Sequence, residues 1–263
     1  MEELVLSNIS SDKLLRKAIC ILSYPWNNAD IAMDRLKELQ AINVGKLIFE
    51  GRSTICNAKI LGKGTNSIVL KCEYKGRLAV LKVLRLDASR NSLKLEAEIL
   101  KRIESLNLAP RLYTYDHWYI VEEYIDGVPI SEYSTYLDST DPDIVKRVVE
   151  KILCNALSLD LSGVDHGELS RPMKHILIST DENVYFIDFE SASMSRRPKN
   201  LTSIVQYLLN HDKWCNYIIE MCRVKDVRTI YKVLGEYKRL SDPKIIMELF
   251  EIECTNLRRP APL

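Results

Sequence analysis

Glycine and proline are scarce in this 263-residue chain, at nine of each, which excludes collagen-like and low-complexity linker architectures. An excess of charge is also missing, because 37 lysines and arginines balance 36 acidic residues. The sequence therefore has no strong electrostatic footprint for nucleic acid. No apolar run approaches the roughly 18 residues of a membrane-spanning helix, so no membrane contact is expected. The 46% of hydrophobic residues indicates a soluble globular protein of one or two domains.

The N-terminus and the cysteines predict the compartment. The chain opens with Met1, Glu2 and Glu3, which are acidic where a secretory signal would be basic. Its seven cysteines are odd in number and form no CxxC pair. We expect them to be buried as small apolar side chains rather than joined in disulfides or bound to metal. These features predict a reducing, cytoplasmic setting.

Residues 1–56 are predicted to form a small helical N-terminal extension. Apolar residues recur at helical spacing over residues 12–22 and 29–40, with Tyr24 and Pro25 in the break between them. A short apolar strand over residues 46–49 follows. Two helices are too few to indicate a DNA-binding winged helix.

From residue 57 the pattern changes to strands with one helix, and later to helices. The predicted strands cover residues 59–61, 67–74, 78–84, 112–115 and 118–125, and the predicted helix covers residues 92–105. After residue 127, a long helix (142–161) precedes a small strand pair (176–179 and 184–188), and several helices follow from about residue 201. The predicted fold class is α+β, with a small antiparallel-sheet lobe (57–126) and a mainly helical lobe (127–263).

The first lobe carries a glycine-containing loop and a lysine with a glutamate beyond it. Residues 61–69 read LGKGTNSIV, which suits a tight hairpin as well as a phosphate-binding loop. A strand follows it, so it does not match the dinucleotide fingerprint, and it is no P-loop. Lys82 lies in the apolar strand AVLKV, and Glu96 in the predicted helix. Taken alone, Lys82 or Glu96 would more often be exposed to solvent. The order of glycine-containing loop, lysine and glutamate favours a functional site.

The second lobe offers two acidic positions at the ends of predicted elements. Glu168 lies in VDHGEL after the long helix, and Asp188 in VYFIDFE at the end of a strand. Such a pair suits metal binding and proton transfer. Taken singly, Asp188 could be a turn aspartate, and His166 is more typical of a hydrogen-bonded structural histidine.

These segments, in this order, resemble the protein-kinase-like superfamily. GKGTNSIV looks like the glycine-rich loop, AVLKV like the lysine strand and EAEIL like the helix with the partner glutamate. Residues 118–127 resemble the hinge, HGEL the catalytic loop and IDFE the metal-binding segment. The HG form is similar to atypical kinases of the RIO and KEOPS type and to small-molecule phosphotransferases. The overall likeness, over about residues 57–210, is to the predicted serine/threonine kinases of archaea.

The resemblance implies ATP and Mg²⁺ as cofactors, with a two-lobed kinase fold. The ATP phosphates would be covered by three loop residues, Gly62, Lys63 and Gly64. Lys82 would hold the α- and β-phosphates and pair with Glu96. The backbone of Glu123 and Ile125 would meet adenine at the hinge.

In the second lobe, the resemblance makes Asp188 the metal ligand and puts Glu168 in the place of the catalytic aspartate. The asparagine that binds a second metal falls at Met173, or at His175 after a two-residue insertion. Neither suits Mg²⁺, and a nitrogen from His175 would make Mn²⁺ an alternative. Glu190 replaces the glycine of DFG, as in choline-kinase-type enzymes, and is a further candidate oxygen ligand.

The leading interpretation is an ATP- and Mg²⁺-dependent atypical serine/threonine protein kinase, whose substrate is a protein hydroxyl, its own included. HGEL and IDFE leave open a small-molecule kinase of the choline or aminoglycoside type. Glu168 and the asparagine position leave open a nucleotide-binding pseudokinase or scaffold. Residues 191–200, with Arg196, Arg197 and Lys199, leave no room for a long activation loop and are more typical of a solvated basic loop than of a substrate site.

Overall fold

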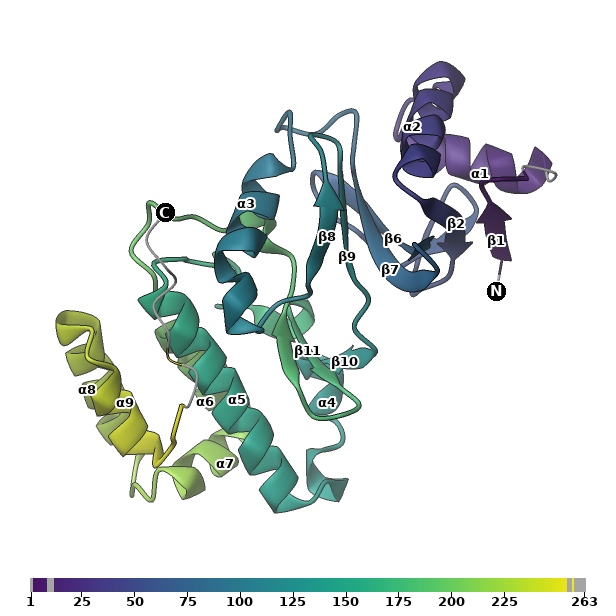
Figure 1. The fold of residues 1–263 in the computed structure, drawn as a ribbon. Helices are drawn as coiled ribbons and strands as arrows, with labels where there is room; N and C mark the ends of the chain where they lie inside the picture. Colours follow the sequence, from purple (N-terminus) through teal and green to yellow (C-terminus); the bar gives the residue numbers. More distant parts are fainter. Residues whose placement is uncertain (1, 9–11, 255–256, 258–263) are drawn as a thin grey trace. The chain divides into compact units, whose positions relative to one another are not determined.

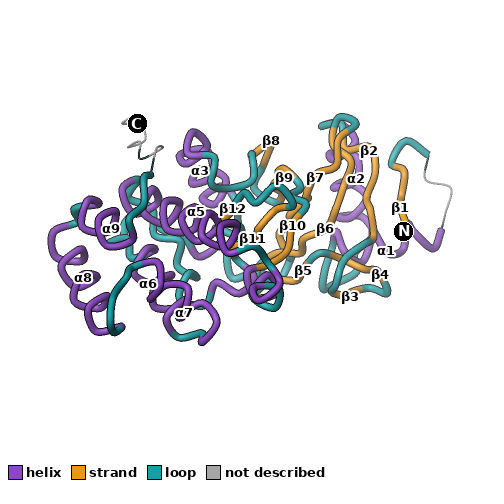
Figure 2. The backbone as a smooth tube through the Cα atoms, turned by 90° about the horizontal axis from the view of Figure 1, so that it is seen from below, coloured by secondary structure: helices purple, strands orange, loops and turns teal. Residues whose placement is uncertain are grey.

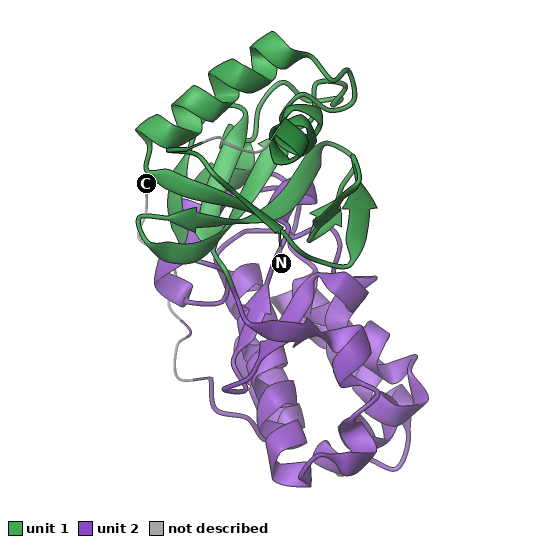
Figure 3. Ribbon diagram, turned by 90° about the vertical axis from the view of Figure 1, so that its right-hand side faces the viewer, with its two compact units in different colours: residues 1–98, 111–124 green, residues 99–110, 125–263 purple. Residues whose placement is uncertain are grey.

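The computed structural model describes residues 2–8, 12–254 and 257. The chain forms two compact units (Figure 3). Unit 1 contains residues 1–98 and 111–124, and unit 2 contains residues 99–110 and 125–263. The fold is α+β, with an antiparallel sheet in unit 1 and mainly helices in unit 2.

The sheet of unit 1 has seven strands in the order β1-β2-β6-β7-β9-β8, with β5 paired to β6 (Figure 1). A two-residue turn, Lys75-Gly76, joins β6 and β7, and both residues have positive φ angles, of 50° and 75°. Such turns match the twist of a hairpin, and the predicted hairpin is confirmed. The strands are β1 (Glu2–Val5), β2 (Val44–Phe49), β5 (Gly62–Lys63), β6 (Ser67–Tyr74), β7 (Arg77–Leu84), β8 (Leu112–Tyr115) and β9 (Tyr119–Glu123), beside the separate pair β3 (Ser53–Ile55) and β4 (Ala58–Ile60).

The N-terminal segment packs onto this sheet instead of forming a separate extension. The helices α1 (Asp12–Leu22) and α2 (Ala29–Ala41) lie where the periodicity predicts them, but β1 and β2 are strands of the same sheet. Buried Arg35 of α2 donates to the carbonyl oxygens of Leu22 and Leu84, at 2.6 and 3.0 Å, and its guanidinium lies 4.6 Å from the Trp118 ring centroid. Long-range contacts of this kind explain why no boundary between the units falls at residue 56.

Unit 2 is built around the long helix α5 (Pro142–Leu161), which begins as its sequence indicates. Asp141 accepts a hydrogen bond from the backbone N–H of Asp143, and Pro142 occupies the first turn. Figure 2 shows α6 and the strands β11 and β12 near α5. The small sheet orders its strands β10 (Gly127–Pro129), β11 (Ile176–Ser179) and β12 (Val184–Phe186).

The helices outside the N-terminal segment are α3 (Lys94–Ile103), which contributes to both units, α4 (Ile130–Tyr133), α5 (Pro142–Leu161), α6 (Asn200–Leu209), α7 (Asp212–Met221), α8 (Val227–Leu240) and α9 (Pro243–Phe250). Four 3₁₀ turns lie at residues Glu104–Leu106, Leu137–Ser139, Pro172–Lys174 and Phe189–Ser191. No helix in the described part of the chain is both long and apolar enough to span a membrane.

The expectation that all cysteines are unpaired is wrong. Cys20 is bonded to Cys56 within unit 1, and Cys154 to Cys254 within unit 2. Their partners lie 36 and 100 residues apart, and sequence spacing does not reveal such pairings. The remaining three are free, and two of them, Cys72 and Cys222, are buried as expected. A cytoplasmic location stays a prediction.

Candidate functional site

A buried ion pair joins the central sheet of unit 1 to α3. Lys82 lies on β7, an interior strand between β6 and β9. Its Nζ atom donates to Oε1 of Glu96 at 2.6 Å, and the two side chains are 3% and 2% exposed. The solvent-exposed alternative for Lys82 is therefore wrong, and the contact with Glu96 is confirmed. Burying both charges is costly, because their attraction must offset lost hydration.

The glycine-containing loop lies between β4 and β6. Gly62 and Lys63 form the short strand β5, and the N–H of Gly64 donates to the carbonyl of Ser67 at 2.8 Å. No atom lies within 4 Å of the position that a Cβ of Gly62 would occupy. The packing of unit 1 therefore does not require a glycine at position 62.

The two residues predicted to meet adenine lie at the end of β9, where Glu123 is the last residue of the strand, and in the connection after it, which contains Ile125. The backbone N–H of Glu123 donates to the carbonyl of Arg111 at 2.9 Å, so this donor already has a partner. Ile125 is buried, and the boundary between the units falls directly before it. A role for the backbone of Glu123 and Ile125 in binding adenine stays a prediction, without the N–H of Glu123.

In unit 2, the loop His166-Gly167-Glu168 packs against the segment after β12. Gly167 has a φ of +90°, and a Cβ there would lie 2.6 Å from the carbonyl oxygen of Ser191. Only glycine suits this backbone and this distance. The hydroxyl of Ser191 donates to Oε1 of Glu168 at 2.7 Å. The HG form of the motif is therefore a packing requirement of this loop, and it brings Glu168 beside Ser191.

His166 is a buried residue of the same loop. It is fully buried, and its Nε2 lies 3.1 Å from the carbonyl oxygen of Ile187. A carbonyl can only accept, so Nε2 carries the proton. Burial lowers the pKa of His166 to about 4, with the nearby His175 acting in the same direction. The ring is neutral at pH 7, and its role is structural, as the residue type suggested.

Asp188 lies at the end of β12 in a left-handed conformation, with φ of 66° and ψ of 68°. Such backbone is uncommon for a residue other than glycine and is often found at functional sites. His175 is the nearer of the two candidates for the asparagine position: its Nδ1 lies 3.8 Å from Oδ2 of Asp188. The other candidate, Met173, has a half-exposed side chain.

Asp188 offers one carboxylate to a metal ion, and the described residues around it do not form a closed metal site. Among the described residues, no group of three or more His, Cys, Asp or Glu side chains is arranged to hold a metal. Mg²⁺ commonly uses one or two carboxylates together with substrate phosphates and waters, and Asp188 supplies such a carboxylate. Nδ1 of His175 is buried and has no hydrogen-bond partner, so it fits the softer Mn²⁺ better than Mg²⁺. Burial lowers the pKa of His175, against the charge of Asp188, and this favours the neutral ring that a ligand needs.

Two hydrogen bonds of Arg196 in unit 2 were not predicted from the sequence. Arg196 Nε donates to buried Asp165 at 2.8 Å, and its Nη2 donates to the carbonyl of Ser191 at 2.6 Å. Arg196 is exposed, as predicted for a solvated basic loop, with its side chain 51% accessible, and these two hydrogen bonds hold its guanidinium. Arg197 also has a partner, the carbonyl of Lys238. A run of charged residues does not show which arginine is paired with a distant carboxylate, so the sequence held no signal for the contact with Asp165.

Asn200, at the start of α6, fixes the other end of the HG loop. Its Oδ1 accepts from the backbone N–H of His166 at 2.9 Å, and its Nδ2 donates to Val164 and to Asp160. Burial raises the pKa of Asp160 to about 6. Asp160 lies in the last turn of α5, where an acidic side chain opposes the helix dipole. This unfavourable position of Asp160 was the one signal in the sequence that its side chain makes tertiary contacts.

Alanine at Gly167 is expected to destabilise the protein by about 2–5 kcal/mol, the sum of left-handed strain and a clash with a backbone carbonyl. Gly163 is the matched control, because its φ is also positive, at 74°, but no atom lies within 4 Å of its Cβ position. Gly163→Ala should cost only the strain, about 1–2 kcal/mol. Urea denaturation of both variants measures the difference. Equal losses would show that the Ser191 contact does not constrain the loop.

Comparison with known proteins adds one relative. No protein-family model matches the sequence. The chain is similar to an uncharacterized protein, MJ1211, of Methanocaldococcus jannaschii, with 32% identity over 120 residues. The match covers 99% of that protein and 45% of this chain. This chain therefore belongs to the same family as that archaeal protein.

Proposed function

We propose that this protein is an ATP-dependent phosphotransferase with a protein-kinase-like fold, and that it transfers the γ-phosphate to a serine or threonine hydroxyl of a protein. The observation that carries the proposal is the buried pair of Lys82 and Glu96, at 2.6 Å. Lys82 lies on β7 of the antiparallel sheet, and Glu96 lies on α3. The neighbouring strand, β6, directly follows the glycine-containing loop. Kinases use such a lysine on nucleotide phosphates and such a glutamate to hold it.

Unit 2 carries groups of the types that the rest of this chemistry would need. The carboxylate of Asp188 would hold the metal ion, which supplies positive charge for the phosphates. Glu168 would accept the hydroxyl proton; its Oε1 is bound by Ser191, so Oε2 is the oxygen assigned to the base. Phosphoryl transfer depends chiefly on positioning and charge neutralisation, and the contacts of Gly167 and Asn200 fix this loop.

A second candidate is a nucleotide-binding protein without transfer. It is favoured by His175, which stands beside Asp188 where an oxygen ligand is usual, and by the longer side chain of Glu168. Transfer to the hydroxyl of a small molecule is a variant of the first candidate. The two variants differ only in which product carries the label, a protein or a metabolite.

The test combines ATP binding and transfer in wild type and in Gly62→Ala. Wild type should be stabilised by Mg·ATP in a thermal-shift titration, since a ligand that binds only the folded state raises its stability. Gly62→Ala should melt at the same temperature without ligand, because its Cβ meets open space, but should bind ATP about tenfold more weakly if phosphate approaches the loop. The matched control is Gly235→Ala on α8, which also has open space.

Transfer is then measured with labelled ATP and Mg²⁺ or Mn²⁺, alone and with cell extract, followed by separation of labelled protein from labelled metabolite. Labelled protein supports the leading proposal, and labelled metabolite a small-molecule kinase. The absence of any Mg·ATP-dependent stabilisation at millimolar ligand would reject both candidates.

A further inference from the structure

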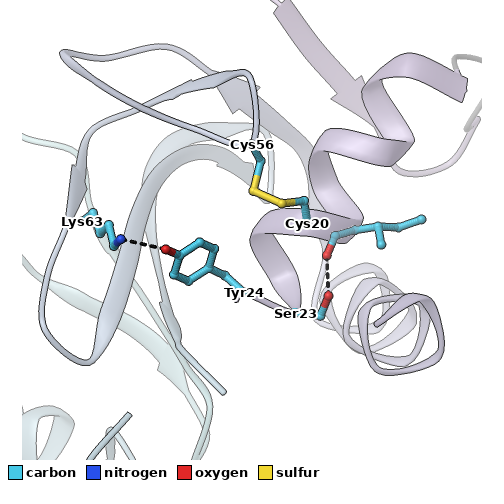
Figure 4. The surroundings of a disulfide bond; sticks show 6 residues. Cys20, Ser23, Tyr24, Cys56 and Lys63 are labelled. Atoms are coloured by element: carbon cyan, nitrogen blue, oxygen red, sulfur yellow. Dashed lines mark hydrogen bonds between the residues drawn. A yellow bond between two sulfur atoms is a disulfide. The ribbon is translucent and has the colours of Figure 1, made fainter. Parts of the chain in front are cut away.

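The N-terminal segment holds the glycine-containing loop through one tyrosine. Tyr24 follows α1, and its hydroxyl oxygen accepts a hydrogen bond from Nζ of Lys63 at 2.8 Å (Figure 4). The same ammonium lies 4.7 Å from the centroid of the Tyr24 ring. Lys63 is a residue of β5, between the two loop glycines. The contact therefore joins residues that are far apart in the sequence, at the loop assigned to nucleotide binding.

Arg85 strengthens the same contact from the end of β7. Its guanidinium lies 5.2 Å from the centroid of the Tyr24 ring, and its Nη1 donates to the carbonyl oxygen of Gly64 at 2.9 Å. The backbone carbonyl of Tyr24 accepts from the N–H of Leu86 at 2.9 Å. Tyr24 thus contacts two cations that are themselves part of, or bonded to, the glycine-containing loop.

A disulfide lies beside this contact and connects the two segments that form it. Cys20 is in α1, four residues before Tyr24, and Cys56 is seven residues before Lys63, in the turn between β3 and β4 (Figure 4). The bond and the Tyr24–Lys63 contact therefore close a small ring of chain. Both cysteines are partly exposed, so a reductant has access to the bond.

We propose that the Cys20–Cys56 disulfide and Tyr24 form a redox-sensitive clamp on the glycine-containing loop, which tightens nucleotide binding when the disulfide is present. The inference rests on the proposed function, since it concerns regulation of the same site. A loop that is held in place before the ligand arrives loses less freedom on binding, and each immobilised side chain that need not be ordered saves about 0.5–1.5 kcal/mol. That difference corresponds to about 2- to 10-fold in affinity.

The redox step is an exchange with a dithiol. A thiolate of the reductant attacks one sulfur of the Cys20–Cys56 bond and forms a mixed disulfide. The second thiol of the reductant then attacks this mixed disulfide and releases the protein with both cysteines reduced. Two electrons and two protons pass to the protein, which gains two thiols, while the dithiol becomes a disulfide. The reverse exchange with an oxidised dithiol restores the clamp.

Hydrogen exchange of the backbone amides of residues 62–67 tests the clamp without any nucleotide. Exchange should be about 2- to 10-fold faster after reduction with dithiothreitol, in Cys20→Ser/Cys56→Ser and in Tyr24→Ala. Tyr24→Phe keeps the ring but loses the hydroxyl, and should fall between wild type and Tyr24→Ala. Cys154→Ser/Cys254→Ser removes the other disulfide, in unit 2, and should leave these amides unchanged. Alkylation and mass spectrometry of the thiols verify each redox state.

ATP affinity of the same proteins, measured by calorimetry, tests the regulation. We expect weaker binding, by the same 2- to 10-fold, in every form with faster exchange, and no further effect of dithiothreitol on Cys20→Ser/Cys56→Ser. Identical exchange with and without the Cys20–Cys56 bond would overturn the clamp. Faster exchange with unchanged ATP affinity would overturn its effect on nucleotide binding. Faster exchange in a protein that binds no ATP in any form would instead support the clamp and reject the proposed function.

Discussion

Replacing Lys82 with methionine is expected to lower the free energy of unfolding by about 3–5 kcal/mol. Methionine keeps the length and the apolar stem of the lysine, so packing is largely preserved. The loss comes from Glu96, whose carboxylate is buried 2.6 Å from the missing ammonium. A buried charge deprived of its partner keeps its desolvation cost but loses the attraction that offset it. Urea denaturation at pH 7 measures the change.

The double variant Lys82→Met/Glu96→Leu separates stability from ligand binding. Replacing both members of a buried ion pair with apolar side chains is often neutral or stabilising, so this variant should recover most of the loss. It should nevertheless show no Mg·ATP-dependent thermal shift, because the cation for the phosphates is gone. Additive losses in the double variant would contradict the coupling of the pair. A stable double variant that binds Mg·ATP like wild type would remove Lys82 from the nucleotide site.

Replacing Glu168 with glutamine is expected to lower the rate of phosphoryl transfer by about 10²- to 10⁴-fold, the usual contribution of a general base. Glutamine keeps the shape of the side chain, and its amide oxygen still accepts the hydrogen bond from Ser191, which lies 2.7 Å away in the wild type. It cannot take the proton of the acceptor hydroxyl. ATP affinity should be unchanged. Initial rates of label transfer at saturating Mg·ATP measure the effect.

Two further variants distinguish the base from its support. Ser191→Ala removes one hydrogen bond, of about 1 kcal/mol, and should slow transfer by roughly tenfold or less. Glu168→Asp shortens the side chain by one methylene and moves its oxygens by about an ångström, which can cost on the order of 10²-fold. If Glu168→Gln turns over like wild type, Glu168 is not the base. If wild type binds ATP and labels no acceptor, the protein is a nucleotide-binding protein without transfer.

The sequence by itself determined the elements whose signal is local. The strands at residues 67–74, 112–115 and 176–179 and the helix at residues 142–161 lie at the predicted bounds. Alternation, helical spacing, turn residues and caps act over about ten residues, so the chain shows them directly. The same locality explains the strands that were missed: β1, β3, β5 and β10 are short and gain their stability from pairing with β2, β4, β6 and β11.

Apart from the pair of Lys82 and Glu96, which the resemblance implied, only the tertiary structure decided which distant residues meet. Lys82 and Glu96 were each ambiguous in isolation, and burial of both made them an ion pair. Gly167 is required because the carbonyl of Ser191 lies against it, at a distance set by the fold. The two disulfides, the contact of Arg196 with Asp165 and that of Asn200 with His166 likewise join residues that are 31 or more positions apart. The local sequence pattern does not reveal such pairings, because their free energy depends on how the whole chain packs.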